Sequence, residues 1–498
     1  MMETVNQKIK AASAEFIAYS YIMLFIYAAA NKLLAFDSFQ VQLAQSPLLS
    51  AFAGWISWLV PALEIMIALG LMAKKCRPVF LFLSFTLMAM FSVYIAIMLY
   101  CSPFVPCSCG GILEKLGWEE HLAFNVLFVL LGIMGFLLET AGTRTAFRKA
   151  SAITAGLLLG TAIVAVLFLV SEDMIRHRNN FTRRFPHHPA ELRHELDLKS
   201  EAYYIAGSGN GAVFLGSHAS PLTVTVVDSA LHRVNKFAIA LETKKRPYNS
   251  LRITVAPPHF FVSDGTETFI FRGRTADWKA RLWSDRNAYF NAIVPIDSTA
   301  VAIRAISSQN HENVLGILKG GSGGSVSLHP LLEKQIDGIF DTAGSLLYNP
   351  QVKKLLYVYA YRNEFFITDA RMAGKTVGHT IDTVSRVKIK VAFVGSEKGS
   401  KIASPALKVN NAAATFGNYL FVHAALMGKF EPRSMWDEAS VIDAYAISDQ
   451  SYRFSFYVYG KRKKKMRDFI LTQDRLYALV GQYLTVYRLR DTFYEKKQ

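Results

Sequence analysis

Long apolar runs dominate the first third of the chain. Five of them are long enough to form helices across the hydrocarbon core of a membrane, which takes about 20 residues each. They lie at about 14–31, 54–73, 79–100, 121–139 and 151–171. The first run is not followed by a small-residue cleavage site, so we expect it to be retained as a signal anchor. The pattern predicts a bundle of five transmembrane helices.

From about residue 200 the pattern changes to short alternating runs of β-branched and aromatic residues, separated by turns rich in Gly, Asp, Asn and Ser. These runs recur at intervals of roughly 40–55 residues, which is the spacing of four-stranded propeller blades. We therefore predict an all-β propeller of six blades, with a pair of β-sandwiches as the alternative fold. The predicted domains are a four-helix membrane domain over 1–140, a fifth transmembrane helix over 141–171, a basic linker over 172–200 and the propeller over 201–491.

Charged residues are distributed unevenly along the chain. Of the net charge of +17, only +2 belongs to residues 1–170. If the N-terminus is cytoplasmic, eight basic residues flank the spans on the inner side and two on the outer side, a bias that favours this orientation. The inner ones are Lys8, Lys10, Lys74, Lys75, Arg77, Arg144, Arg148 and Lys149, and the outer ones are Lys32 and Lys115. We therefore expect a multi-pass protein of the inner (cytoplasmic) membrane with a periplasmic propeller, in contact with membrane lipids and not with nucleic acid.

Few polar side chains lie within the spans. Glu64 is in the second span, Lys32 closes the first, and His121 and Asn125 open the fourth on one helix face. Ionisable groups at such depth usually face the interior of the bundle. We expect Glu64 to lie near Lys32; the alternative role for Glu64 and Asn125 is only to join helices by hydrogen bonds.

Three of the four cysteines, Cys101, Cys107 and Cys109, lie just after the third span, on the predicted outer side, and Cys76 lies on the inner side. A Cys-x-Cys disulfide closes a very small ring, and strained or exposed disulfides are readily exchanged. The alternatives are a structural bridge from Cys101 to Cys107 or Cys109, and capture of a metal ion.

Several of these segments together resemble the MauE/DoxX group of membrane proteins over about residues 10–140. The segments are Asn31-Lys32-Leu33, Phe39, Pro61-Ala62-Leu63-Glu64, Pro106–Gly111 and Trp118–Asn125. The resemblance implies a four-helix membrane module associated with redox reactions, which in methylamine-utilisation operons is linked to maturation of a disulfide-rich subunit. Residues 336–369 are similar to TolB-like six-bladed propellers.

Three other segments suggest sites that we do not expect to form. His177, His187, His188 and His194 lack the fixed spacing of metal ligands, so no metal site is predicted. Gly320–Ser325 lacks the ending of a phosphate-binding loop and predicts a flexible connection. The basic run Lys461–Lys465 predicts a hairpin tip that is free to touch lipid phosphates.

These features lead to one main hypothesis. Thiol–disulfide exchange oxidises or reduces an extracytoplasmic protein client held by the propeller. Cys107 or Cys109 is the exposed thiolate, Cys101 is the resolving cysteine, and His121 or Lys32 is the nearby positive group that favours the thiolate. The chain is then a membrane thiol–disulfide oxidoreductase or its accessory subunit, with electrons passing to or from a quinone by analogy with other membrane disulfide enzymes. The rival hypothesis is a propeller binding platform, or a transport-complex subunit, with the bundle as a non-catalytic anchor.

Overall fold

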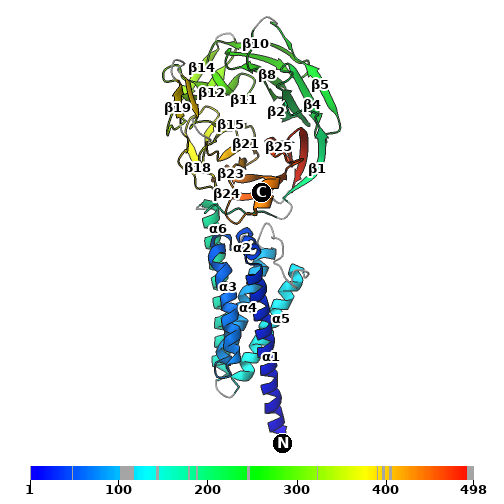
Figure 1. Cartoon of the computed structure of the whole chain (residues 1–498), viewed down its shortest axis with the longest axis vertical. Helices are drawn as coiled ribbons and strands as arrows, with labels where there is room; N and C mark the ends of the chain where they lie inside the picture. The colour runs from blue at the N-terminus through cyan, green and yellow to red at the C-terminus, as the bar shows by residue number, and fades with distance from the viewer. Residues whose placement is uncertain are drawn as a thin grey trace. The chain divides into compact units, whose positions relative to one another are not determined.

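The computed structural model describes residues 2–46, 49–100, 117–141, 145–177, 180–186, 189–243, 247–321, 324–389, 391–394, 399–402 and 406–490. The chain divides into two compact units, Met1–His187 and His188–Gln498 (Figure 1). The first unit is helical and the second is built almost entirely from β-strands.

The helical unit contains five helices that are long and apolar enough to cross a membrane, which confirms the number of predicted spans. Its helices are α1 (Met2–Leu34), α2 (Phe36–Gln45), α3 (Ala53–Met72), α4 (Arg77–Tyr100), α5 (Trp118–Glu139) and α6 (Ala146–His177). The short helix α2 lies between the first two predicted spans, where the sequence analysis predicted no helix.

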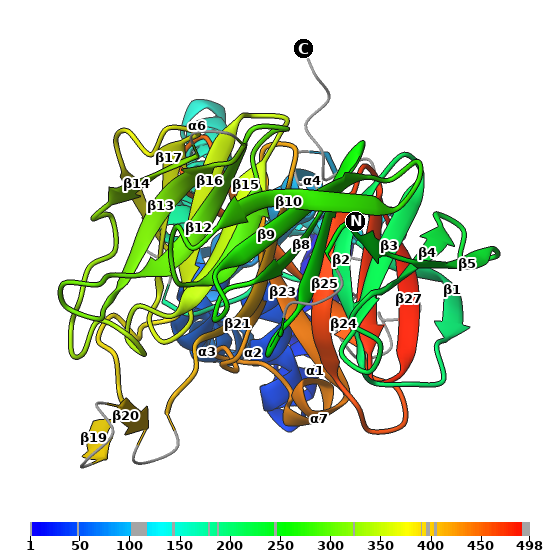
Figure 2. The ribbon, with the colours of Figure 1, turned by 90° about the horizontal axis from the view of Figure 1, so that it is seen from above.

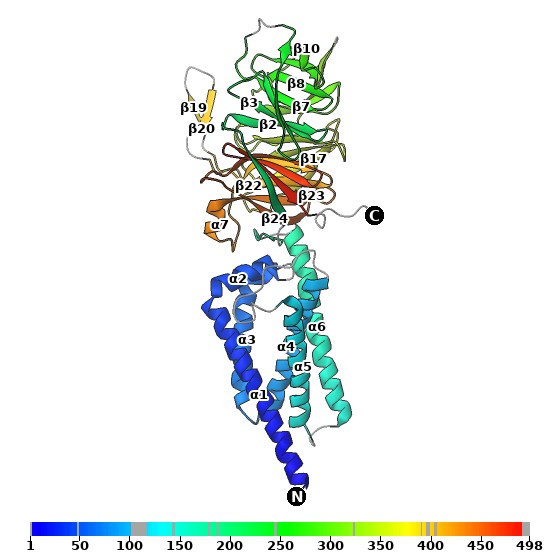
Figure 3. The ribbon, with the colours of Figure 1, turned by 90° about the vertical axis from the view of Figure 1, so that its right-hand side faces the viewer.

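The five long helices run alongside one another (Figures 1 and 3). The core of this unit is formed by large side chains such as Tyr21 of α1, Phe85 of α4 and Phe136 of α5. Side chains of the same apolar kind, including Met23 and Leu130, point outward and are exposed. A helix that is apolar on all sides is typical of a membrane span, because lipid covers its outer face.

The second unit contains 27 strands within the described ranges. They are β1 (Ala190–Asp197), β2 (Tyr203–Gly209), β3 (Ala212–Ser217), β4 (Thr223–Asp228), β5 (Val234–Ala238), β6 (Ala240–Leu241), β7 (Arg252–Ala256), β8 (His259–Asp264), β9 (Phe269–Arg274), β10 (Lys279–Asp285), β11 (Phe290–Pro295), β12 (Ala300–Ile306), β13 (Asn313–Lys319), β14 (Ser325–His329), β15 (Gly344–Asn349), β16 (Lys354–Tyr359), β17 (Glu364–Asp369), β18 (Thr376–His379), β19 (Val391–Val394), β20 (Gly399–Ile402), β21 (Asn410–Phe416), β22 (Tyr419–Ala424), β23 (Ala439–Ala446), β24 (Tyr452–Tyr459), β25 (Met466–Thr472), β26 (Arg475–Val480) and β27 (Tyr483–Leu489). One short helix, α7 (Arg433–Glu438), lies between β22 and β23.

In the described part of this unit, 24 of the 27 strands form six antiparallel groups of four around a centre (Figure 2). Of the other three, β6 pairs with β10, and β19 pairs with β20; a parallel bridge between β2 and β7 joins the first two groups into one sheet. The groups are β2–β5, β7–β10, β11–β14, β15–β18, β21–β24, and β25–β27 together with β1. The first strand of each group contacts the first strand of the next, in the order β2, β7, β11, β15, β21, β25 and back to β2. This closed ring is propeller-like, as predicted, and differs from a pair of sandwiches, in which two sheets pack face to face.

Ring closure uses the two ends of the β unit. Strand β1 pairs antiparallel with β27, from Ala190 opposite Leu489 to Asp197 opposite Tyr483, and so completes the last group. Helix α6 and strand β1 therefore occupy much of the stretch 172–200 that we predicted to be a linker. A strand was not evident there because Ala190–Asp197 alternates charged and apolar residues weakly, and because its partner lies almost 300 residues away.

Candidate functional site

The polar side chains of the bundle meet in two places. In the first, Lys32 near the end of α1 reaches Glu64 in the middle of α3, with 2.6 Å between Nζ and Oε1. The Glu64 side chain is 1% exposed and the Lys32 side chain 24% exposed. The structure thus brings together the two residues that the sequence suggested would lie near each other.

Other helices complete the surroundings of this ion pair. The Lys32 ammonium lies 6.0 Å from the ring centre of Phe39 on α2 and 5.9 Å from that of Phe91 on α4. His121, in the first turn of α5, is half-buried and near the Lys32 side chain. Asn125 is buried one turn further along α5. We call Lys32, Glu64, His121 and Asn125 the outer polar cluster; the words outer and inner follow the orientation predicted from the sequence.

One atom of the outer polar cluster lacks a partner. The second carboxylate oxygen of Glu64, Oε2, is buried and accepts no hydrogen bond from any residue the structure describes. A buried carboxylate oxygen without a donor is costly, and native proteins usually satisfy such atoms. An ion pair that only holds two helices together does not require a carboxylate oxygen without a hydrogen-bond donor.

The second polar group lies at the opposite end of the bundle and was missed by the sequence analysis. Arg77, the first residue of α4, lies 3.1 Å from Glu139 at the end of α5 and 3.7 Å from Glu15 of α1. Lys74 also pairs with Glu15, at 2.9 Å. The sequence did contain a signal for this group. Because successive spans run in opposite directions, the start of α4 and the end of α5 lie on the same side of the membrane, and these positions carry opposite charges. We call these four residues the inner polar cluster.

The three cysteines of the predicted site, Cys101, Cys107 and Cys109, lie in 101–116, outside the described residues. Their position along the chain still constrains them, because α4 ends at Tyr100 and α5 begins at Trp118. Both ends of this segment are therefore attached to the end of the bundle that carries the outer polar cluster. The fourth cysteine, Cys76, is exposed next to the inner polar cluster and is a free thiol.

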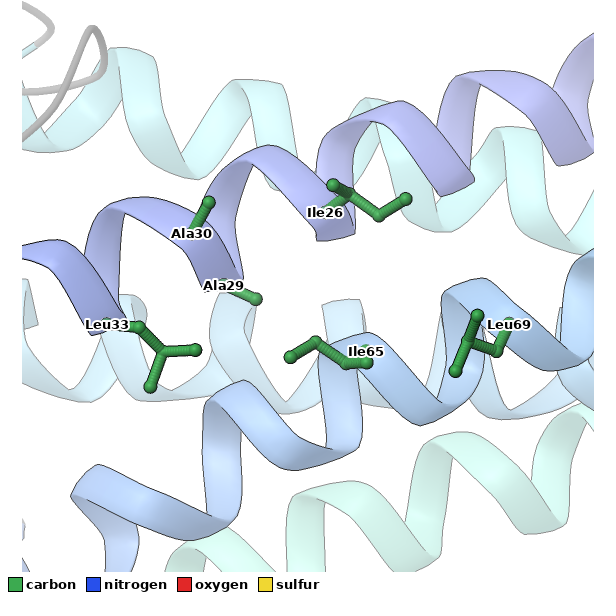
Figure 4. Close-up of a pocket in the computed structure, with 6 residues that line it drawn as sticks. All are labelled: Ile26, Ala29, Ala30, Leu33, Ile65 and Leu69. Atoms are coloured by element: carbon green, nitrogen blue, oxygen red, sulfur yellow. The ribbon is translucent and has the colours of Figure 1, made fainter.

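A shallow groove of about 340 Å³ runs between α1 and α3. It is lined by six apolar residues from the two helices (Figure 4): Ile26, Ala29, Ala30, Leu33, Ile65 and Leu69. Leu33 and Ile65 directly follow Lys32 and Glu64, so the groove and the ion pair lie at the same level of the bundle. An entirely apolar lining is typical of a surface that faces lipid chains.

The histidines and the basic run noted in the sequence have other partners. Among the described residues no three His, Cys, Asp or Glu side chains come together as metal ligands do. His194 lies on β1 against the ring of His232. In the basic run, Lys464 pairs with Glu201 at 3.3 Å, and Lys461 pairs with Glu195 and lies over the ring of Tyr483. The run forms the turn between β24 and β25, as predicted, and two of its five charges are paired with carboxylates of the propeller.

The propeller contains a buried histidine that we expect to make its stability depend on pH. Burial, together with the positive charges of Lys408 and Lys465, lowers the pKa of His423 to about 4, below the value of about 6.5 in an unfolded chain. Between these two pH values the unfolded chain binds a proton at this histidine and the folded chain does not. The free energy of unfolding is therefore highest above pH 6.5 and decreases by roughly 3 kcal/mol as the pH drops toward 4.

Unfolding of the full chain in detergent, measured at several pH values, checks this expectation. His423→Leu should flatten the dependence between pH 6.5 and 4, and replacement of the exposed His232 by Leu should leave it unchanged. Equal slopes for His423→Leu and the unmodified chain would show that another group is responsible.

Comparison with known proteins identifies the first part of the chain. Residues 10–138 match the family model described as Methylamine utilisation protein MauE. No curated protein matches the chain.

Among solved structures, a member of the duf4221 family from Bacteroides vulgatus is 12% identical with a TM-score of 0.39, covering 60% of this chain and 97% of that one. A catalytically inactive virginiamycin B lyase from Staphylococcus aureus, solved with quinupristin, is 10% identical with a TM-score of 0.36, covering 60% of this chain and 99% of that one. The chain is therefore a membrane protein whose residues 10–138 match the MauE family model and whose second unit is a propeller-like β domain.

Proposed function

We propose that this protein carries out thiol–disulfide exchange with an extracytoplasmic client, through Cys101, Cys107 and Cys109. One observation supports the proposal most strongly. The segment that carries all three cysteines is joined at both ends to the end of the bundle where Lys32, Glu64 and His121 gather. A thiol is reactive as its thiolate, and neighbouring positive groups favour that form.

The exchange balances within the protein and its client. The thiolate of Cys107 or Cys109 attacks one sulfur of a client disulfide, a mixed S–S bond forms, and the other client sulfur leaves as a thiolate. Cys101 then attacks the mixed disulfide, closes a disulfide within the segment and releases the client reduced. The reverse sequence oxidises a client dithiol. A quinone that accepts or donates the electrons stays a prediction by analogy, and a single exchange does not require one.

The proposal places the cysteines and the propeller on the same, periplasmic side of the inner membrane, with the N-terminus in the cytoplasm. Five crossings and the excess of basic residues on the inner side support this orientation. The propeller would hold the client close to the cysteines.

Alkylation of intact cells with a membrane-impermeant reagent tests the site and the orientation together. We expect Cys107 and Cys109 to be labelled after growth under reducing conditions and protected after growth under oxidising conditions. Cys76 should remain unlabelled in both, which makes Cys76→Ser the matched control.

A second experiment separates this proposal from the anchored binding platform. Cys107→Ser should abolish mixed disulfides with client proteins, as seen on non-reducing gels. Full function after replacement of Cys101, Cys107 and Cys109 together, in a chain that still inserts, would refute exchange and favour the platform.

A further inference from the structure

We propose that one end of the propeller ring binds the carboxylates of an acidic segment of the client protein, through Lys408, Lys465 and Arg304. This proposal rests on the proposed function, in which the propeller holds an extracytoplasmic client, and adds the chemistry by which the client is recognised. The three residues belong to the described part of the propeller.

The order of the strands brings these three residues to the same end of the ring, whose inner strands lie nearest its centre (Figure 1). Arg304 donates to the carbonyl oxygen of Gly344, the first residue of β15, at 2.6 Å. At the start of β21, the side-chain amide of Asn410 donates to the carbonyl oxygen of Tyr359, the last residue of β16, at 2.8 Å. The backbone N–H of Met466, the first residue of β25, bonds to the start of β23. Because adjacent strands within each group are antiparallel, these contacts place the starts of β15, β21 and β25 at one end, which we call the mouth.

Two lysines lie near one histidine at the mouth. Lys408 lies two residues before β21, and Lys465 directly precedes β25. Burial, followed by the charges of Lys408 and Lys465, lowers the pKa of His423, which is next to the last residue of β22. His423 is 5% exposed, and its Nδ1 has no hydrogen-bond partner among the described residues. The mouth therefore holds two cations beside an imidazole nitrogen whose hydrogen-bonding capacity is not used.

Neither lysine pairs with a carboxylate in the described part of the propeller. The Lys465 ammonium donates to the carbonyl oxygen of Trp436 and lies 5.3 Å from the centre of its ring. Lys408 is exposed as a residue, but its neighbours cover the ammonium enough to lower its pKa. By contrast, Lys461 and Lys464 of the same basic run pair with glutamates. A partly covered ammonium without a counter-charge is unfavourable, and an anion supplied by a partner reduces that cost.

Arg304 adds a positive charge at a second place on the mouth. In the described residues its guanidinium donates to neutral acceptors, which are the side chain of Asn291, the carbonyl group of Gly344 and the hydroxyl of Tyr357. The positive groups thus lie beside β15 as well as beside β21 and β25. Several carboxylates on one polypeptide fit this arrangement better than a single small ion does, and complementary charge also speeds the encounter with an acidic partner.

The carboxylate of Asp468 also lies at the mouth, as the third residue of β25, but its charge is already offset. It lies near Arg252, the first residue of β7, and near Arg467. It also accepts a hydrogen bond from the backbone N–H of Ile205 at 3.3 Å. These arginines leave Lys408 and Lys465 available to a partner.

Binding of fluorescein-labelled hexaglutamate at pH 7, followed by fluorescence polarisation, tests the proposal. The protein is the full chain in a neutral detergent, with the three cysteines of 101–116 replaced by serine so that exchange does not contribute. We expect Lys408→Met combined with Lys465→Met to weaken binding by about tenfold or more, because two charge-assisted contacts are lost. The matched control, Lys353→Met combined with Lys354→Met, removes the same charge at the turn between β15 and β16, at the opposite end of the ring, and should stay within about twofold of the parent.

Two results would overturn the proposal. Equal binding by the Lys408→Met, Lys465→Met variant and the control variant would show that hexaglutamate responds only to the overall charge. Displacement of hexaglutamate by inorganic phosphate at the same concentration would show a site for small anions and not for an acidic segment. Should the double variant not fold, as judged by circular dichroism, Lys408→Met alone at its exposed position should still weaken binding by about threefold.

These outcomes are separate from the outcome for thiol–disulfide exchange. Hexaglutamate binding is measured without the three cysteines, so its loss in the lysine variant does not depend on their chemistry. If the mouth fails to bind the probe while mixed disulfides with the client still form, the exchange stands and this proposal fails. If the mouth binds the probe and no mixed disulfide forms, the acidic site stands and the exchange fails.

Discussion

Replacement of Lys32 by methionine is expected to destabilise the helical unit by about 3–5 kcal/mol, the usual cost of removing one partner of a buried ion pair. The expectation follows from the burial of Glu64, whose side chain is 1% exposed and whose only described donor is the Lys32 ammonium. Without that ammonium, a carboxylate remains in the interior of a membrane bundle. Thermal unfolding of the variant in detergent, followed by circular dichroism at the helical band, measures the loss.

Two companion measurements test the cause. Lys32→Met combined with Glu64→Gln removes the isolated charge, and we expect it to recover most of the lost stability. Lowering the pH should also help the single variant, because protonation neutralises Glu64. A double variant as unstable as the single one would mean that Lys32 acts by packing against Phe39 and Phe91 and not by neutralising Glu64.

The second large effect is expected in the propeller, at Arg362. This residue lies between β16 and β17 and is fully buried. Its guanidinium donates to the carbonyl oxygen of Glu333 at 2.9 Å and to the carboxylate of Glu364 at 3.2 Å, and it lies 3.5 Å from the ring centre of Tyr359. Arg362→Met fills similar space but leaves a carbonyl group and a carboxylate that is only 14% exposed without their donor, so we expect a loss of about 3–5 kcal/mol.

Chemical unfolding of the full chain, followed by the fluorescence of the buried Trp278 and Trp283, reports this loss. Arg433→Met is the control, because the Arg433 side chain is 87% exposed and lies 4.0 Å from Asp437. Exposed pairs of this kind contribute little, and the change should stay within about 0.5 kcal/mol. A similar small effect for Arg362→Met would show that water replaces the lost hydrogen bonds.

Much of the fold could be predicted from the sequence because its signals are local. Apolar runs of about 20 residues are typical of membrane-spanning helices, and the five runs in this chain form five long helices. Turn residues in the β unit were equally informative. Asp264 accepts hydrogen bonds from the backbone of Asn249 and Ser250, and these bonds help to hold its pKa below the usual range. Asp341 accepts from the backbone of Gln335, Ile336 and Gly338.

Features that depend on distant partners were not predictable in the same way. Helix α2 has only ten residues, fewer than a membrane span needs, so a search for long apolar runs does not find it. Strand β1 is recognisable only through its pairing with β27, and the inner polar cluster only through the packing of α1, α4 and α5. The Lys32–Glu64 contact was predictable because charged residues within membrane spans are rare and tend to find one another.

The pairing of β1 with β27 also sets an order of events during synthesis. Strand β1 leaves the ribosome soon after the fifth helix, but its partner follows almost 300 residues later. At translation rates of about 5–20 residues per second, β1 waits for roughly 15–60 seconds with an unpaired edge. A truncated chain that ends before Tyr483 would never satisfy that edge, so aggregation or degradation, rather than a smaller stable propeller, is the expected fate of incomplete products.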